Sequence, residues 1–395
     1  MSLDIALSGI DAINSQLDSI SNNIANTGTW GFKSGRANFA SMYSGMQPNG
    51  VYVGSVTQSI DMAGGVVKTG EGLNAAIQGR GFFTVKDTDG SLLYTRVGIF
   101  TRDKDGYIID NLDHRVQGYS GGGGGAFGDM QVKTGDLAAK ATDTLDYVGK
   151  LSADWKTPTS TPFSKDDPNS YNGSQSSIVY DSLGVKHEVT QYFVQTGTGG
   201  NNTIEVHYTM DGKDVTPSAA PTLSFDSNGT LTTKMPITID FGQPTGAADI
   251  KVKINYTGTT YSGGDFSTTT NRADGYASGS LTGVALDEDG TLEATFSNGE
   301  KQPIGRLALA TFPDDNGLQA VTGTCWKQTN TSGQPIYGVP GAGLSGKLAV
   351  QALEQSNVDQ TGELVNLTTA QRNYQANSKV ISTENQMMQA LMQAV

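Results

Sequence analysis

The sequence is poor in the residues that disulfide-linked and membrane-spanning proteins need. Cys325 is the only cysteine among 395 residues, which excludes an intrachain disulfide framework. No apolar run reaches the roughly 20 residues that a membrane-spanning helix requires, so we predict no membrane span. The N-terminus also lacks the basic segment, apolar core and cleavage site of a cleaved signal peptide. These signals predict a cytoplasmic protein unless export uses a route that cleaves nothing.

Basic residues are scarce as well. The chain has 26 Lys and Arg against 39 Asp and Glu, a formal net charge of -13. Nucleic acid binding depends on clustered basic side chains that neutralise phosphates. We therefore predict no nucleic acid partner.

Motifs of catalysis and cofactor binding are incomplete. The stretch "GAGLSGKL" (341–348) comes close to a phosphate-binding loop, but Leu348 replaces the hydroxyl residue that would hold magnesium, and no βαβ pattern surrounds it. A nucleotide-binding enzyme remains the alternative to a plain glycine loop here. Three Asp-x-Asp-Gly units resemble calcium loops without the glutamate at the twelfth position, and β-turns explain them; they lie at 87–90, 103–106 and 287–290. We predict no enzyme, no metal site and no cofactor.

Glycine is abundant, with 51 residues, and the middle of the chain is rich in Thr, Ser and Asn. Alternating strand patterns with Asp-Gly turns at 89–90 and 105–106 indicate β structure. We predict an inner β domain in two halves, 71–144 and 279–355, with an outer β domain, 145–278, inserted between them.

Both ends of the chain carry apolar residues at intervals of seven, which is typical of helices that pack along a narrow seam. The predicted N-terminal helix spans 1–28, and its seam comprises Leu3, Ile10, Ile13, Leu17, Ile20 and Ile24. The predicted C-terminal helix spans 356–395, and its seam comprises Leu367, Tyr374, Ile381 and Met388. Residues 29–70 are predicted to form an extended connecting arm.

The predicted fold class is therefore mixed. N- and C-terminal α-helices form a coiled-coil-like pair, with two mostly-β domains inserted between them. Helices this polar are marginal alone and gain most of their stability from packing. We expect association with further copies of the chain to order both ends.

Several stretches resemble the bacterial flagellar rod and hook proteins. The terminal stretches "SGIDAINSQLDSISNNIANTGTWGFKSGRANF" (8–39) and 352–393 resemble the terminal signatures of that family, and "AAIQGRGFFTV" and "YTRVGIFTRDKDGYIID" resemble its inner domain. The 145–278 segment is similar to the inserted β domain of the hook members, whereas distal rod members are shorter and lack it. A distal rod protein is one alternative, and a secreted β-domain binding module or adhesin is another.

The resemblance implies a structural subunit of the flagellar hook. Such subunits form a curved helical tube outside the cell, a universal joint that transmits torque from rod to filament. Export through the flagellar type III channel would need no cleaved signal. The implied partners are further copies of the chain, a rod protein, the hook cap and the hook-filament junction protein.

The resemblance also assigns a role to the residues after the first helix. The seam residues would form the assembly interface, and Trp30 and Phe32 would anchor the connecting arm on a neighbouring subunit. Ordinary packing of Trp30 and Phe32 within one subunit is the alternative. The pentaglycine at 121–125 departs from the family pattern, and its role stays open.

Overall fold

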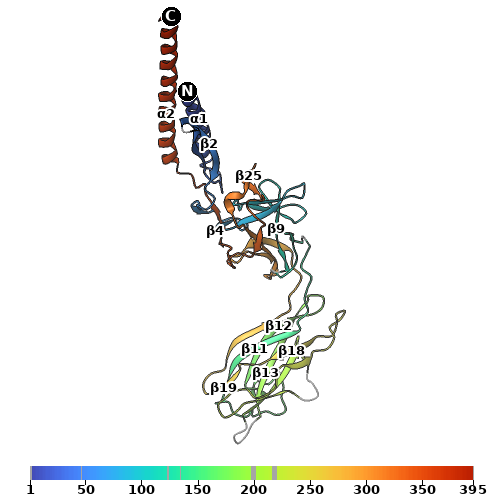
Figure 1. Ribbon diagram of the computed structural model, residues 1–395. Helices are drawn as coiled ribbons and strands as arrows, with labels where there is room; N and C mark the ends of the chain where they lie inside the picture. Colours follow the sequence, from blue (N-terminus) through green and yellow to red (C-terminus); the bar gives the residue numbers. More distant parts are fainter. Residues whose placement is uncertain are drawn as a thin grey trace. The chain divides into compact units, whose positions relative to one another are not determined.

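The computed structural model of the chain resolves into two compact units (Figure 1). It describes residues 2–45, 47–121, 124–133, 135–196, 202–215 and 220–394, so Gly122 and Gly123 of the pentaglycine lie outside the described residues. Unit 1 comprises Met1–Thr134, Gly283–Thr295 and Lys301–Val395, and unit 2 comprises Gly135–Thr282 and Phe296–Glu300. Both ends of the chain thus belong to unit 1.

Two long helices are the first and last elements of unit 1, and they lie side by side (Figure 1). They are α1 (Ser2–Ala25) and α2 (Gln360–Ala394). The Asp359 carboxylate accepts a hydrogen bond from Thr361 N at 3.1 Å, which caps the start of α2. The contact between α1 and α2 confirms the predicted pair of terminal helices flanking β-rich domains.

The chain leaves α1 through a tight turn. Gly31 adopts φ +66°, and a Cβ there would lie 3.0 Å from the backbone of Arg96 and Val97, so the position requires glycine. The segment that follows folds as an antiparallel hairpin of β1 (Gly35–Ser44) and β2 (Gln47–Gln58). The hairpin packs on α1, and Val51 N donates a hydrogen bond to Ser8 Oγ at 3.2 Å.

In the β part of unit 1, strands that precede unit 2 in the sequence pair with strands that follow it. Short pairs join β3 (Val66–Lys68) to β29 (Ala352–Glu354) and β4 (Ala75–Gln78) to β28 (Lys347–Val350). Within the described residues, the largest sheet has 13 strands. They are β5 (Phe82–Lys86), β6 (Leu92–Thr95), β7 (Phe100–Arg102), β8 (Ile108–Asp110), β9 (Arg115–Ser120), β10 (Phe127–Asp129), β21 (Leu281–Leu286), β22 (Thr291–Phe296), β23 (Lys301–Leu307), β24 (Leu309–Thr311), β25 (Gln319–Val321), β26 (Cys325–Lys327) and β27 (Ile336–Gly338).

An aromatic core holds this sheet together. Phe82 lies 5.4 Å from Trp326 between ring centroids, and Tyr94 meets Phe312 edge to face at 4.8 Å. Each of these rings is almost completely buried. Because the rings come from both early and late strands, the two chain segments share one core.

Unit 2 is a β-sandwich with its own core. In the part of the chain that the structure describes, one five-stranded sheet comprises β11 (Thr144–Ser152), β17 (Ile237–Asp240), β18 (Lys251–Asn255), β19 (Thr260–Ser262) and β20 (Ser267–Ala273). The other comprises β12 (Gly173–Tyr180), β13 (Lys186–Gln195), β14 (Thr203–Met210), β15 (Lys213–Asp214) and β16 (Thr222–Ser224). Alternate side chains of both sheets, among them Tyr147 and Phe193, fill one buried cluster.

Candidate assembly surface

An apolar seam joins the two terminal helices. Ile13, Ile20 and Ala370 are buried in it. Leu17, Ile24 and Leu367 are half-buried and pack against these three. Burying an aliphatic side chain contributes roughly 1.5–3 kcal/mol when the burial is complete, so this cluster stabilises the pair within one subunit. Five of the predicted seam residues therefore meet inside the subunit: Ile13, Leu17, Ile20, Ile24 and Leu367.

A buried side-chain amide fixes the seam where α1 ends and α2 begins. Asn23 is only 1% exposed. Its Nδ2 donates to Glu363 Oε1 at 2.7 Å and to Gly35 O at 2.8 Å, and its Oδ1 accepts from Gly35 N at 2.8 Å. One side chain thus connects α1, the start of β1 and α2, which explains why asparagine stands where the chain leaves the helix.

Other predicted interface residues remain accessible in the single subunit. Leu3, Tyr374 and Met388 are exposed, and Met388 keeps 59% of its surface accessible. The half-buried members are Ile10, Trp30, Phe32 and Ile381. Leu364, Leu391 and Met392, which widen the predicted C-terminal stripe beside its seven-residue positions, are exposed as well. The sequence pattern missed the exposed apolar residues Ile5, Leu7, Val365, Val380 and Met387. Leu7 lies four residues after Leu3 and three before Ile10, and this helical spacing relative to the seam was a signal that could have found it.

A groove of about 320 Å³ opens where α1, α2 and the hairpin meet. A Cβ on Gly9 would lie 2.7 Å from Asn377 Nδ2, so glycine permits the close approach of the helices here. The groove is lined by Gly9, Ala12, Ile13, Gln16, Phe39, Val51, Asn373, Ala376 and Asn377. Every lining residue is uncharged, and we name this feature the helix groove.

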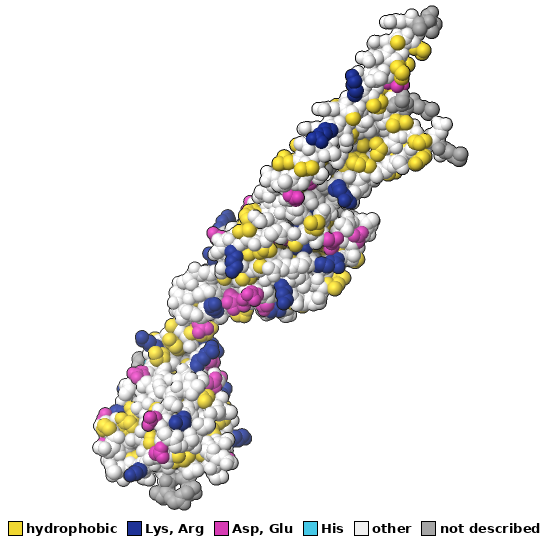
Figure 2. All heavy atoms as spheres, turned by 90° about the vertical axis from the view of Figure 1, so that its left-hand side faces the viewer, with side chains coloured by type: hydrophobic (Ala, Val, Ile, Leu, Met, Phe, Trp, Pro, Cys, Tyr) yellow, Lys and Arg dark blue, Asp and Glu magenta, His cyan; other side chains and the backbone are white. Residues whose placement is uncertain are grey.

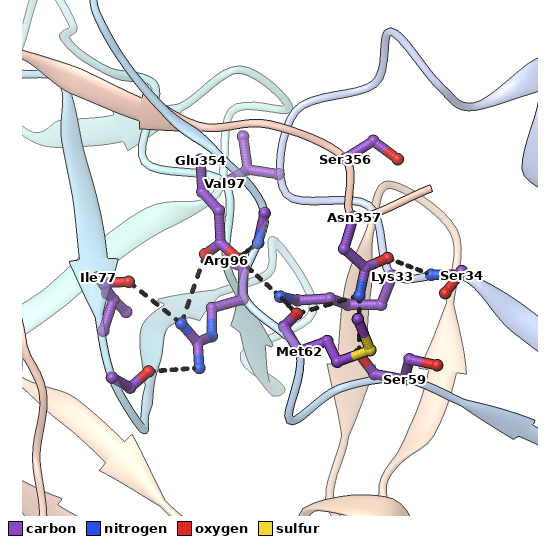
Figure 3. A network of polar contacts seen from close by, with 12 residues as sticks. Lys33, Ser34, Ser59, Met62, Ile77, Arg96, Val97, Glu354, Ser356 and Asn357 are labelled. Atoms are coloured by element: carbon purple, nitrogen blue, oxygen red, sulfur yellow. Dashed lines mark hydrogen bonds and ion pairs between the residues drawn. The ribbon is translucent and has the colours of Figure 1, made fainter. Parts of the chain in front are cut away.

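A buried charge network lies where both helices join the β part of unit 1 (Figure 3). Lys33 Nζ lies 2.6 Å from Glu354 Oε1, and both side chains are fully buried. Arg96 Nη1 lies 3.4 Å from Glu354 Oε2, so one carboxylate faces two cations. Backbone carbonyls accept further hydrogen bonds, from Lys33 Nζ to Met62 O at 2.7 Å and from Arg96 Nη2 to Gly79 O at 2.9 Å, whereas the buried Arg96 Nε has no hydrogen-bond partner among the described residues.

Burial of this network disfavours the charged forms of its two basic side chains. Burial lowers the pKa of Lys33, although the Glu354 carboxylate opposes this effect. Burial lowers the pKa of Arg96 in the same way, again against the attraction of Glu354. A buried ion pair of this kind stabilises a structure only while its partners stay together. We name Lys33, Arg96 and Glu354 the junction triad.

Asn357 extends the network toward α2 (Figure 3). Its Oδ1 accepts a hydrogen bond from Ser34 N at 2.7 Å, and its Nδ2 donates to Ser59 O at 2.9 Å and to Met62 O at 3.0 Å. The backbone before α2 is therefore pinned to the backbone after α1. Sequence reasoning missed this junction, and its only local signal was a lysine between aromatic and glycine residues in "WGFKSG".

Comparison with protein families gives three matches along the chain. Residues 76–144 match the flagellar hook protein FlgE/F/G D1 domain, and residues 150–276 match the flagellar basal body protein FlaE D2 domain. Residues 349–394 match the flagellar basal body rod FlgEFG protein C-terminal region. The flagellar hook protein FlgE of Salmonella typhimurium is 35% identical over 99% of both chains, and that of Escherichia coli is 36% identical over 99% of both.

The chain belongs to the flagellar hook protein FlgE family. It is a hook subunit, a structural protein rather than an enzyme, and it assembles as a polymer within the extracellular flagellum. This finding confirms the hook prediction over the distal rod protein and the adhesin.

A crystal structure of the Helicobacter pylori flagellar hook protein FlgE2 shares the fold, with a TM-score of 0.53 and 15% identity over 73% of this chain and 99% of that chain. Across the described residues, no helix is long and apolar enough to cross a membrane.

Proposed function

We propose that the hook subunit polymerises through the helical end of unit 1. The observation that carries this proposal is the apolar surface that remains exposed after α1 and α2 have packed on each other. Figure 2 shows hydrophobic side chains gathered around the helices and the hairpin. Exposed apolar side chains that gather in this way mark interaction sites.

The predicted interface residues then divide into two groups. The buried seam residues order the helix pair inside each subunit, and the exposed ones, such as Leu3, Tyr374 and Met388, contact neighbouring subunits. Trp30 and Phe32 are half-buried, so part of each side chain is accessible for anchoring on a neighbour. Both groups act together, because a neighbour can only bind a helix surface that its own subunit holds in place.

The same geometry suggests how the tube works and what it meets. A head-to-tail polymer has two unlike ends, and we propose that one end meets the rod protein. The other end would meet the hook cap during growth and the hook-filament junction protein afterwards. Repetition of the same contacts around a curved tube would let it bend as a universal joint while it transmits torque.

We also propose that the β parts are separate domains, with 145–278 as the outer one. Unit 2 has a core of its own, and the matched D2 domain covers 150–276. The inner domain would combine 71–144 and 279–355, whose strands pair with one another, as β5 does with β24. Residues 29–70 would connect this domain to the helices as an arm, and because the hairpin of β1 and β2 folds back on α1, the segments before and after the hairpin would make the connection.

A charge in the seam tests the assembly proposal. Ile20→Asp places a carboxylate at a site that is 4% exposed, which is strongly unfavourable unless the charge is paired. We expect no tubes by electron microscopy, with both β parts still folded by circular dichroism. Asp18→Asn is the control, because it changes an exposed charge on the same helix and should leave assembly intact. Normal tubes from Ile20→Asp would contradict the proposal.

A further inference from the structure

Helix α2 extends beyond the start of α1. It has 35 residues against 24 in α1, and the two helices are antiparallel, because Gly9 faces Asn377 and Asn23 bonds to Glu363. Continuing this register places Ser2 opposite about residue 384. Residues 386–394 therefore project past their partner helix, and we name this segment the overhang.

The overhang carries an uncharged apolar stripe. Its sequence, "QMMQALMQA", contains no charged residue. Met387 and Met388 are followed four residues later by Leu391 and Met392, so the two adjacent pairs lie one above the other on one broad side of the helix, and all four side chains are 59–74% exposed. Methionine is a flexible side chain that fills irregular apolar spaces. This stripe therefore suits insertion into an uneven hollow.

The helix groove has the matching chemistry. Its lining includes the small residues Gly9, Ala12 and Ala376 of the helices and the apolar side chains of Phe39 and Val51 of the hairpin. An apolar cavity of about 150 Å³ accepts a benzene-sized group, so the groove's volume of about 320 Å³ has room for roughly two side chains. The amides of Gln16 and Asn373 can hydrogen-bond to the glutamine amides of an incoming overhang.

An overhang cannot reach the groove of its own chain. Ala376 and Asn377 of α2 line the groove, and Met388 stands about 16 Å further along the same continuous helix. Only a second copy can bring the stripe to the groove. A contact between two different surfaces of identical chains does not close on itself unless its rotation completes a ring, so it generates open helical polymers.

We propose that the overhang of one hook subunit docks in the helix groove of another copy. This inference rests on the proposed assembly through the helical end of unit 1 and names its two contacting surfaces. The groove shares Ile13 with the buried seam, so the docking surface is continuous with the helix pair.

Charge substitutions in the full chain test the docking. Met388→Lys and Ala376→Glu each place one unpaired charge into the contact, and both positions are exposed in the single subunit, so folding should be unaffected. Each should raise the protein concentration needed for polymerisation at least about tenfold, measured by light scattering. Gln389→Lys and Gln375→Glu are matched controls that add the same charges beside the stripe and beside the groove, and they should polymerise like the parent.

A double variant distinguishes a direct contact between the overhang and the groove from two independent defects in polymerisation. Met388→Lys combined with Ala376→Glu places opposite charges face to face, so it should polymerise more readily than either single variant. Single variants that polymerise at the parent concentration, or a double variant worse than both, would overturn the docking. If that happens while Ile20→Asp still fails to form tubes, the proposed function stands and only the overhang contact is wrong. Overhang variants that polymerise normally but no longer bind another flagellar protein would also exclude a second copy as the occupant.

Discussion

Among the residues of the junction triad, Glu354 should contribute most to the stability of unit 1 against unfolding. Its carboxylate faces Lys33 and Arg96 in a fully buried setting and accepts a hydrogen bond from Gly64 N at 3.0 Å. Glu354→Gln keeps the shape of the side chain and removes its charge. The variant therefore removes the carboxylate that pairs directly with both buried cations, while packing around the site stays nearly the same.

The expected effect is large. Removing one partner of a buried ion pair costs about 3–5 kcal/mol. In a folding unit of about 150–250 residues, each kcal/mol shifts the unfolding midpoint by about 2–4 °C. Glu354→Gln should therefore lower the unfolding temperature of unit 1 by about 6–20 °C. Lys33→Met in the same chain removes one of the orphaned cations, so the double variant should lose less stability than the sum of the two single variants.

Differential scanning calorimetry of the full chain is the assay. Unit 2 has its own core and serves as an internal reference whose transition should not move. Glu293→Gln is the control variant, because Glu293 and Lys301 form a pair whose side chains are 34% and 63% exposed. Exposed pairs contribute about 1 kcal/mol or less. If Glu354→Gln lowered the unfolding temperature of unit 1 no more than the control variant does, the junction triad would not be a significant source of stability.

The division of the chain leads to three further predictions. A fragment of residues 29–358, which lacks both helices, should stay monomeric by light scattering where the full chain polymerises; tubes from it would contradict assembly through the helices. A fragment of residues 135–282 should unfold cooperatively because it contains its own core, and a disordered circular dichroism spectrum would show that it does not fold alone. Burial disfavours the charged form of His187, but hydrogen bonds to Asp211 and Asp181 outweigh burial and raise its pKa. Its stabilisation of unit 2 is therefore complete below about pH 6.5 and is lost as pH rises through the raised pKa, and His187→Gln should flatten this dependence in thermal unfolding measured across that range.

Local patterns predicted the elements whose causes are local. The seven-residue spacing predicted both terminal helices, because a helix places residues seven apart on nearly the same side. The Asp-Gly turns were predicted as well: Gly90 and Gly106 have φ of +87° and +86°, and their amides donate to Asp87 O and Asp103 O. In each case the residues that determine the geometry lie within a few positions of one another.

Family resemblance supplied the function. It rested on sequence stretches at the two ends and in the inner domain, and the inserted 145–278 segment favoured the hook members over the distal rod members. The stretches in residues 8–39 and 352–393, together with those of the inner domain, indicate the hook and rod proteins. No periodicity or composition could have done so, because a helix pair around β domains is compatible with many functions.

Only the tertiary structure decided how the ends of the chain meet. Spacing could not show that Ile13 and Ile20 are buried while Leu3 and Met388 stay exposed, because burial depends on the register between two helices that are far apart in the sequence. The junction triad was equally invisible, since Lys33 and Glu354 are separated by 321 positions. A buried charge is tolerable only where folding brings its counter-charge to it, so the reason for Lys33 lies in the three-dimensional contact and not in its neighbours along the chain.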